Sequence, residues 1–379
     1  MNQRNIAAGI VASLLAIISG PAIISEAAAN GNFTTSQTIL WLFTIYAVGG
    51  ILGIIMSLRF RIPIVGAHSI TGAAFLATVT SQFTYADLIG AYLLSGLLLL
   101  VVGLSGIFSK LLDYVPKEIV SAMLAGMITK YMTNYIVSTS QLLVVGGSSL
   151  LVYLYFCKGI KRFPPMIAAV ITGVILLLCT HAFTDRGTPV GFVFPQIQVP
   201  EFNVISFFSV ALPLALLILS NDCAVGLAAL EQNDYRPPVN QIVITSGIFS
   251  IVAGFLGGQC ANIGGMMTAI CAGEEAGPRE NRYMGAVVSG IMLLTFGLFA
   301  WKLVPWLQAL PGTFIAILIG FALLGVFVNS LQISFSQPTM KISVTFAFII
   351  ALANITMFSI GAPVWSLLVG TLIARYIEN

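Results

Sequence analysis

The sequence predicts an all-α integral membrane protein, and three observations support this fold class. Hydrophobic residues make up 58% of the 379 residues and charged residues only 8%, whereas soluble domains carry about 25% charged residues. Apolar stretches repeatedly reach the roughly 20 residues that a helix needs to cross hydrocarbon. The basic residues gather in the loops on one side of these stretches. No part of the chain has the composition of a separate soluble domain.

The apolar stretches form two groups of seven, which predicts 14 transmembrane segments. Spans 1 to 7 are 6–26, 36–58, 64–81, 86–108, 116–136, 139–157 and 164–183. After a polar connection, spans 8 to 14 are 206–230, 239–257, 258–273, 283–303, 312–332, 341–358 and 361–377. Spans 3 and 10 are too short to cross a bilayer as helices alone. Each is therefore predicted to be a short strand followed by a half-helix.

The distribution of basic residues predicts the orientation. With the N-terminus in the cytoplasm and alternating spans, 13 of the 16 Lys and Arg residues fall inside, as the positive-inside rule requires. Only Lys130, Arg186 and Lys302 fall outside or within spans. Omitting either half-helix as a crossing would disrupt this alternation. Both termini are therefore expected in the cytoplasm.

Because seven is odd, the second group of spans enters the membrane from the opposite side. The two groups are therefore predicted to be inverted repeats, 1–184 and 206–379, as in many transporters. Three weak matches occur in the same order in both repeats. Ser19-Gly20-Pro21 in span 1 aligns with Ser220-Asn221-Asp222 in span 8, and Ser69–Ala73 aligns with Asn262–Met266. Spans 5 and 12 both open with proline and have a small-residue interior.

Asp222 is the first candidate for chemistry, because it lies near the middle of span 8 between apolar runs. An intramembrane carboxylate is costly unless it is protonated, paired or facing a cavity, so it marks a functional site by default. Burial favours its neutral form, which makes Asp222 a candidate proton carrier. The structural alternative is an acid hydrogen-bonded to a neighbouring span. Asn221 would hydrogen-bond the substrate or satisfy nearby backbone groups.

His68 lies where the extended part of span 3 meets its half-helix. An imidazole can gain or lose a proton near neutral pH, so His68 could pair with Asp222, donate to an anionic substrate, or only pack.

The two predicted half-helix N-termini form a candidate anion site. Free backbone N–H groups and the positive end of the helix dipole attract negative charge there without Lys or Arg. The residues concerned are Ser69, Ile70 and Thr71 in span 3 and Asn262, Ile263 and Gly264 in span 10. The structural alternative is that these small residues only allow close helix packing. No Walker motif is present, so ATP is not the expected energy source, and no cofactor or metal is expected.

Four blocks resemble the benzoate–proton symporter (BenE-type) family over essentially the whole chain. They are PIVGAHSITGAAFL, VPKEIVSAMLAGM, SVALPLALLILSNDCAVGLAAL and GGMMTAICAGEEAGPRENRYMGAVVSGI. The resemblance implies the seven-plus-seven inverted-repeat fold of uracil permease-like transporters and sulfate/anion exchangers. A core domain would comprise spans 1–4 and 8–11 (6–108 and 206–303) and a gate domain spans 5–7 and 12–14 (116–183 and 312–377). Similar transporters often work as dimers through the gate domain, in the bacterial cytoplasmic (inner) membrane.

By position, the resemblance assigns a substrate site to three segments. These are Ala67, His68, Ser69 and Ile70 in span 3, Asn221 and Asp222 in span 8, and Ala261, Asn262, Ile263 and Gly264 in span 10. Asp222 and His68 are the candidates for proton coupling.

The leading functional hypothesis is a secondary transporter for the proton-coupled uptake of a small organic anion, best matched by an aromatic carboxylate such as benzoate. The core would move against the gate in an elevator-like step. The expected partners are the substrate, protons and the lipid bilayer, with no nucleic acid. The alternatives are a nucleobase–proton symporter of the same fold and an uncoupled anion channel or exchanger. A membrane-embedded enzyme is a distant third, because one acid and one histidine make no catalytic constellation.

Overall fold

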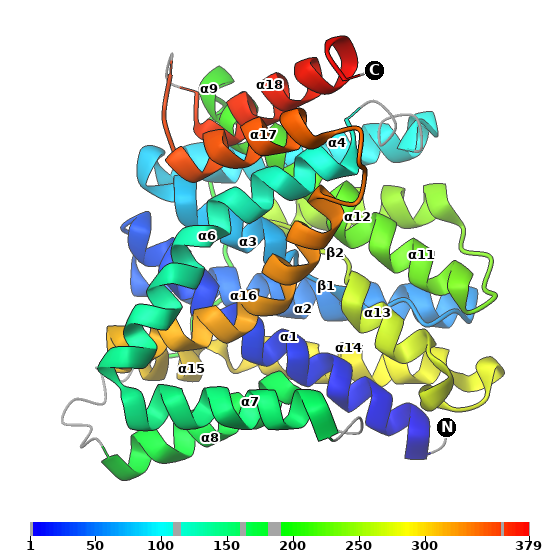
Figure 1. Cartoon of the computed structure of the whole chain (residues 1–379). Helices are drawn as coiled ribbons and strands as arrows, with labels where there is room; N and C mark the ends of the chain where they lie inside the picture. Colours follow the sequence, from blue (N-terminus) through cyan, green and yellow to red (C-terminus); the bar gives the residue numbers. More distant parts are fainter. Residues whose placement is uncertain (1–2, 109–114, 160–163, 181–190, 358–359, 379) are drawn as a thin grey trace.

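The computed structural model describes residues 3–108, 115–159, 164–180, 191–357 and 360–378, and in this part the chain is mostly helical (Figure 1). The first half contains α1 (Gln3–Asn30), α2 (Thr35–Phe60), α3 (Ile70–Val79), α4 (Tyr85–Ser105), α6 (Lys117–Gln141), α7 (Ser148–Gly159) and α8 (Pro165–Thr180). The second half contains α9 (Val204–Ser206), α10 (Leu212–Leu217), α11 (Ala224–Gln232), α12 (Val239–Phe255), α13 (Gly265–Ala272), α14 (Tyr283–Leu298), α15 (Ala300–Gln308), α16 (Gly312–Ser334), α17 (Lys341–Ala353) and α18 (Ala362–Tyr376).

Within these residues, five helices are long and apolar enough to cross a membrane, or up to seven if each of two bent pairs counts as one span. The multi-pass character is therefore confirmed, whereas the number of 14 crossings stays a prediction. Several predicted spans are shorter apolar helices, such as α8, α12 and α17. The ends of the predicted spans at 181–183 and 358 lie outside the described residues.

The chain bends sharply at two places that differ from the predicted span boundaries. The chain bends by 116° between the helical segments Lys117–Gln141 and Leu143–Lys158. This bend lies a few residues after the predicted boundary between spans 5 and 6. The sequence predicts span 11 as one segment, 283–303, but the chain bends by 65° between α14 and α15. Apolar composition continues through such a bend, so hydropathy alone does not reveal it.

Span 8 forms one helical run from Val204 to Gln232, as predicted, but the run is not regular. Two π-helical turns interrupt it, at Phe207–Ala211 and Ile218–Cys223. A π turn widens the helix by one residue and is frequent at functional sites. The second of these turns contains both Asn221 and Asp222.

The predicted strands precede both half-helices and pair with each other. Strand β1 (Gly66–Ala67) is antiparallel to β2 (Asn262–Ile263), with Gly66 opposite Ile263. The backbone N–H of Gly264 donates to Val65 O at 2.8 Å and extends the pairing by one bond. Extended backbone at membrane depth must find hydrogen bonds inside the protein, and each strand supplies them to the other. The pairing therefore sets the starts of α3 and α13 close together.

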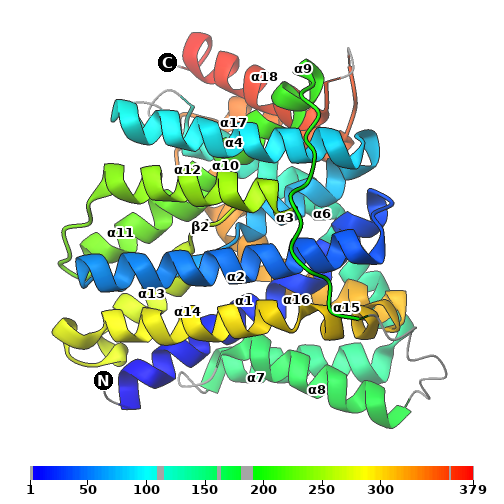
Figure 2. The same cartoon turned by 180° about the vertical axis from the view of Figure 1, so that it is seen from behind.

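The helices around this strand pair come from both halves of the sequence. Helix α2 packs against α14, α4 against α12, and α1 against α3, α13 and α14. On another side, α6 packs against α16 and α17. Residues 191–203, between the halves, run in an extended path across α2, α12 and α4 (Figure 2). This segment is tied down where Gln198 N donates to Phe255 O at 2.7 Å and Glu201 N to Ala86 O at 3.0 Å. The division into core and gate domains stays a prediction.

Candidate substrate site

The N-terminus of α3 is held in place by its own residues. The hydroxyl of Ser69 caps the helix by accepting the backbone N–H of Gly72 at 2.9 Å, and it lies 3.0 Å from the Thr71 hydroxyl. The backbone N–H of Ser69 donates to the thiol sulfur of Cys260 at 3.3 Å, which joins this turn to the segment before β2. Ser69 is fully buried. Its side chain therefore positions the helix start as an N-cap.

The N-terminus of α13 lacks such a side-chain cap. Gly264 is the N-cap residue and has no side chain to accept a hydrogen bond. The first N–H groups of a helix have no partner within the helix. In the first turn of α13 they are therefore left to a ligand or to water, and the dipole adds partial positive charge at the same place. The other end of α13 is capped by Arg282, whose guanidinium donates to Ala272 O at 2.6 Å.

Asp222 lies beside both half-helix starts. Its carboxyl group is near the side chains of Ser69 and Asn262, and its backbone carbonyl lies against Gly265, the first residue of α13. The residue is 9% exposed, and its Oδ2 has no hydrogen-bond partner. Asn221 donates to the Ser220 hydroxyl at 3.2 Å. The wide π turn thus brings two consecutive polar side chains to the same region.

His68 is buried and lacks polar partners. It is 2% exposed, and neither ring nitrogen forms a hydrogen bond. The ring lies edge-on to Tyr46, with centroids 5.0 Å apart, and against Gly20 of α1. The Tyr46 hydroxyl is engaged elsewhere, because it donates to Ala16 O at 2.8 Å. Asn262 has a similar unpaired group, its side-chain Nδ2.

A cavity of about 520 Å³ opens at the start of α3 and α13, and five of the predicted site residues line it: His68, Ile70, Thr71, Asn221 and Asp222. Ser69, Ala261, Asn262, Ile263 and Gly264 lie behind this lining. Ala261 is bound through its backbone to the Ser250 hydroxyl, and Ile263 packs on Gly226. The structure therefore brings all the predicted segments together, but only some of their side chains face the cavity.

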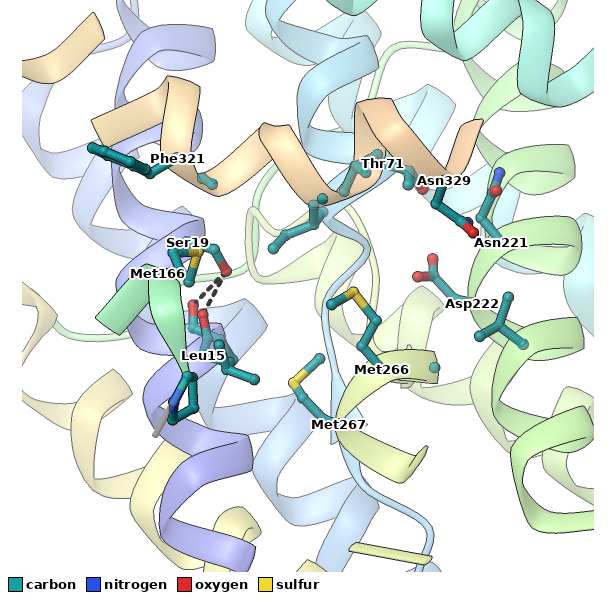
Figure 3. Close-up of a pocket in the computed structure, with 18 of the residues that line it drawn as sticks. Leu15, Ser19, Thr71, Met166, Asn221, Asp222, Met266, Met267, Phe321 and Asn329 are labelled. Carbon is teal, nitrogen blue, oxygen red and sulfur yellow. Dashed lines mark hydrogen bonds between the residues drawn. The ribbon is translucent and has the colours of Figure 1, made fainter. Parts of the chain in front are cut away.

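The cavity has polar and apolar regions. Figure 3 shows the side chains of Asn221, Asp222 and Asn329 on the same side of the cavity. Much of the remaining wall is formed by apolar side chains, which include Leu15, Met166, Met266, Met267 and Phe321. Among the residues described, no group of three His, Cys, Asp or Glu side chains is placed to hold a metal ion.

Sequence reasoning missed the wall contributed by α8 and α16, which includes Met166, Phe321 and Asn329. A polar residue inside an apolar span was the available signal for Asn329. Met166 and Phe321 gave no signal, because apolar residues are ordinary in membrane helices. Ser19 also lines the cavity. The repeat comparison aligned it with Ser220 without assigning it to the site.

Two half-helices that meet beside a buried acid and a cavity define a membrane transport protein. The chain belongs to the family described as "Benzoate membrane transport protein", which it matches over residues 1–376. It is 30% identical over 364 residues to the inner membrane protein YdcO of Escherichia coli (strain K12). It is 28% identical over 374 residues to the benzoate membrane transport protein of Acinetobacter baylyi (strain ATCC 33305 / BD413 / ADP1). Each alignment covers 96% of this chain and 93% of the relative.

Solved structures with the same fold are more distant in sequence. The transmembrane domain of the cyanobacterium bicarbonate transporter BicA superposes with a TM-score of 0.61 at 17% identity, covering 98% of this chain and 97% of that domain. SLC26A9 gives a TM-score of 0.60 at 12% identity, covering 98% of this chain and 64% of that one. The resemblance to the anion-exchanger fold is thus confirmed at the level of the fold. The chain is a multi-pass protein of a bacterial transporter family.

Proposed function

We propose that this protein is a secondary active transporter that takes up an aromatic carboxylate, such as benzoate, together with a proton. The observation that carries the proposal is the grouping of unpaired polar atoms beside an apolar wall. The unpaired atoms are Asp222 Oδ2 and both ring nitrogens of His68 in the cavity wall, and Asn262 Nδ2 behind it. Buried polar groups are normally hydrogen-bonded, so a concentration of unpaired ones suggests that a ligand supplies the partner.

The cavity suits the two parts of an aromatic acid. The carboxylate would lie at the half-helix N-termini, where N–H groups and the helix dipoles favour an anion. The ring would lie against Met266, Met267 and Phe321. Thioether sulfur makes favourable contacts with aromatic rings, and the flexible methionine side chain adapts to ring shape. A small inorganic anion would leave this apolar wall without a partner.

Proton coupling follows from the position of Asp222. Two ionised carboxylates about 4 Å apart repel by about 4 kcal/mol at an effective dielectric constant of about 20. That energy corresponds to roughly a thousandfold loss of affinity. If Asp222 is protonated, it instead donates a hydrogen bond to the substrate carboxylate. The substrate anion therefore binds together with a proton, and His68 is the second group in the cavity able to exchange one.

The remaining features of the proposal concern topology and assembly. The 14 spans would form inverted repeats 1–184 and 206–379, with both termini in the cytoplasm of a bacterial cell. Spans 1–4 and 8–11 would move as a core against a gate of spans 5–7 and 12–14, in an elevator-like step. A homodimer would form through the gate. The distribution of 13 of the 16 basic residues on one side supports this orientation in the inner membrane.

The test is accumulation of radiolabelled benzoate in proteoliposomes with an imposed proton gradient. The native protein should concentrate benzoate, and a protonophore should abolish this. Asp222→Asn should still bind benzoate but should not concentrate it. Glu118→Gln is the matched control, because Glu118 is a second buried carboxyl, 5% exposed, outside the cavity. Gradient-driven accumulation by the Asp222→Asn variant would overturn the coupling assignment.

The same assay separates the two alternatives of the same fold. Competition by uracil or xanthine, without competition by aromatic acids, would identify a nucleobase–proton symporter. Benzoate flux that equilibrates but never accumulates would identify an uncoupled channel or exchanger. Both outcomes would overturn the proposal.

A further inference from the structure

A second cavity, of about 630 Å³, shares α1 and α3 with the first but lies nearer to the C-terminal ends of both helices. On α3, Thr71 lines the first cavity and Thr78 the second. Seven helical residues span about 10 Å, so the two cavities are separated by little more than one half-helix. On α1, Ser19 and Glu26 are related in the same way. The second cavity therefore lies toward the opposite face of the molecule.

The lining of the second cavity is polar, and three of its hydrogen-bond donors lie on one side. Helix α6 provides Lys130 and Asn134, and Asn354 follows α17. In the described part of the chain, no carboxylate forms an ion pair with the Lys130 ammonium, and none of these three side chains donates a hydrogen bond to another protein group. The donors are therefore available to a ligand.

The acceptors on the other side are partly occupied. The C-terminal end of α3 would present free carbonyl groups and partial negative charge. There, however, Asn30 Nδ2 donates to Ala77 O at 2.8 Å. The carboxyl group of Glu26 on α1 lies close to Tyr131. The cavity is thus polarised: its cation is on α6, two of its three amides are on α6 and directly after α17, and its acid is on α1.

We propose that this second cavity is a capture site for the carboxylate of the incoming substrate, centred on Lys130. The identity of the ligand rests on the proposed transport of aromatic acids. A basic residue in a concave site raises the local concentration of anions and the rate of their association. Glu26 on the opposite wall keeps the binding weak, so that the anion passes on to the first cavity. Lys130 and Glu26 therefore act on capture with opposite signs.

The test is the initial rate of benzoate uptake into cells at low ionic strength. Lys130→Gln should raise KM about two- to fivefold with Vmax nearly unchanged, and should weaken the dependence of KM on salt. Glu26→Gln should lower KM. The matched control is Lys302→Gln, because the Lys302 ammonium lies 5.0 Å from the Trp301 ring centre and does not line the cavity.

Sidedness is tested independently with the Asn134→Cys variant. In a background with the exposed Cys157 and Cys179 replaced by serine, the thiol of this variant should react with an impermeant maleimide in intact cells. Millimolar benzoate should slow the reaction.

Three outcomes would overturn the capture site. The first is a KM and salt dependence of Lys130→Gln within error of the native values. The second is a rise of KM in Glu26→Gln that matches the rise in Lys130→Gln, which would indicate a structural role for both. The third is labelling of the Asn134→Cys variant only in opened cells. Failure of the proposed function has a different signature, because the native protein would then take up no aromatic acid at all.

Discussion

Gly66 should be one of the least replaceable residues of the chain, because the strand that carries it lies directly on α2. A β-carbon placed on Gly66 would have three backbone atoms of Gly49 and Gly53 within 3.0 Å, a distance that real Cβ atoms essentially never show. Backbone atoms cannot rotate away as a side chain can. Gly66→Ala should therefore push β1 away from α2 and weaken its pairing with β2.

The cost of this change can be estimated. Overpacking of a well-packed interior typically costs about 1–3 kcal/mol, occasionally more. For 379 residues, an unfolding entropy of about 2.1 cal/mol/K per residue converts about 3 kcal/mol into a fall in Tm of about 4 °C. The assay is thermal unfolding of the purified protein in detergent, together with benzoate affinity. Affinity should fall as well, since β1 leads directly into the start of α3.

Gly312→Ala is the control for this prediction. Gly312 is the first residue of α16, and a β-carbon there would meet nothing within 4 Å. Its replacement should leave Tm unchanged or raise it slightly, because alanine favours helix. If Gly66→Ala has the Tm and benzoate affinity of Gly312→Ala, the close packing of β1 on α2 is wrong, and so is the argument that it positions α3.

Two further predictions concern the cavity wall and the C-terminus. Asn329→Leu should weaken benzoate binding about two- to tenfold, because one hydrogen bond contributes about 0.5–1.5 kcal/mol, while Tm stays unchanged; an unaltered affinity in equilibrium binding would remove Asn329 from the site. Glu378 accepts backbone N–H groups of Ile342 at 2.6 Å and Ser343 at 3.0 Å. Partial burial alone would raise the pKa of its carboxyl, but hydrogen bonds from Ser343 and Ile342 lower that pKa below the ordinary 4.5. Its stabilisation should therefore be present above pH 4.5 and be lost as pH falls through the lowered value, so that acidification costs the native protein about 1 °C more in Tm than Glu378→Gln. Equal pH profiles in a thermal-shift series would contradict this.

The segments that form the site could be predicted from the sequence because each violates a local rule of membrane helices. Span 3 is too short, span 10 is rich in glycine, and Asp222 places a carboxyl group in an apolar run. Such violations are costly and are kept where function needs them. The resemblance to a family then placed them in one site, and the structure brings the three segments together.

The rest of the site depends on packing between elements that are far apart in the sequence. Met166 and Phe321 are 155 positions apart, yet both line the same cavity. Nothing local distinguishes them from neighbouring apolar residues. The π turn at Ile218–Cys223 is another example, because hydropathy is the same for a regular helix and a widened one. The second cavity was missed for a different reason, since a single lysine near the end of a membrane span, such as Lys130, ordinarily extends toward the lipid headgroups and does not by itself indicate a site.

The π turn and the strand pair together explain why a polar site can exist at this depth. The strands satisfy each other's backbone, so the chain can be extended here without unpaired groups of its own. The Ser69 hydroxyl is already used as an N-cap and so is not the main ligand group. Around the two half-helix starts, the buried side-chain atoms that remain unpaired belong to His68, Asp222 and Asn262, and the first two of these residues line the cavity. The strand pair and the Ser69 cap thus use the backbone groups at this point, and the side chains of His68 and Asp222 stay open to the transported molecule and its proton.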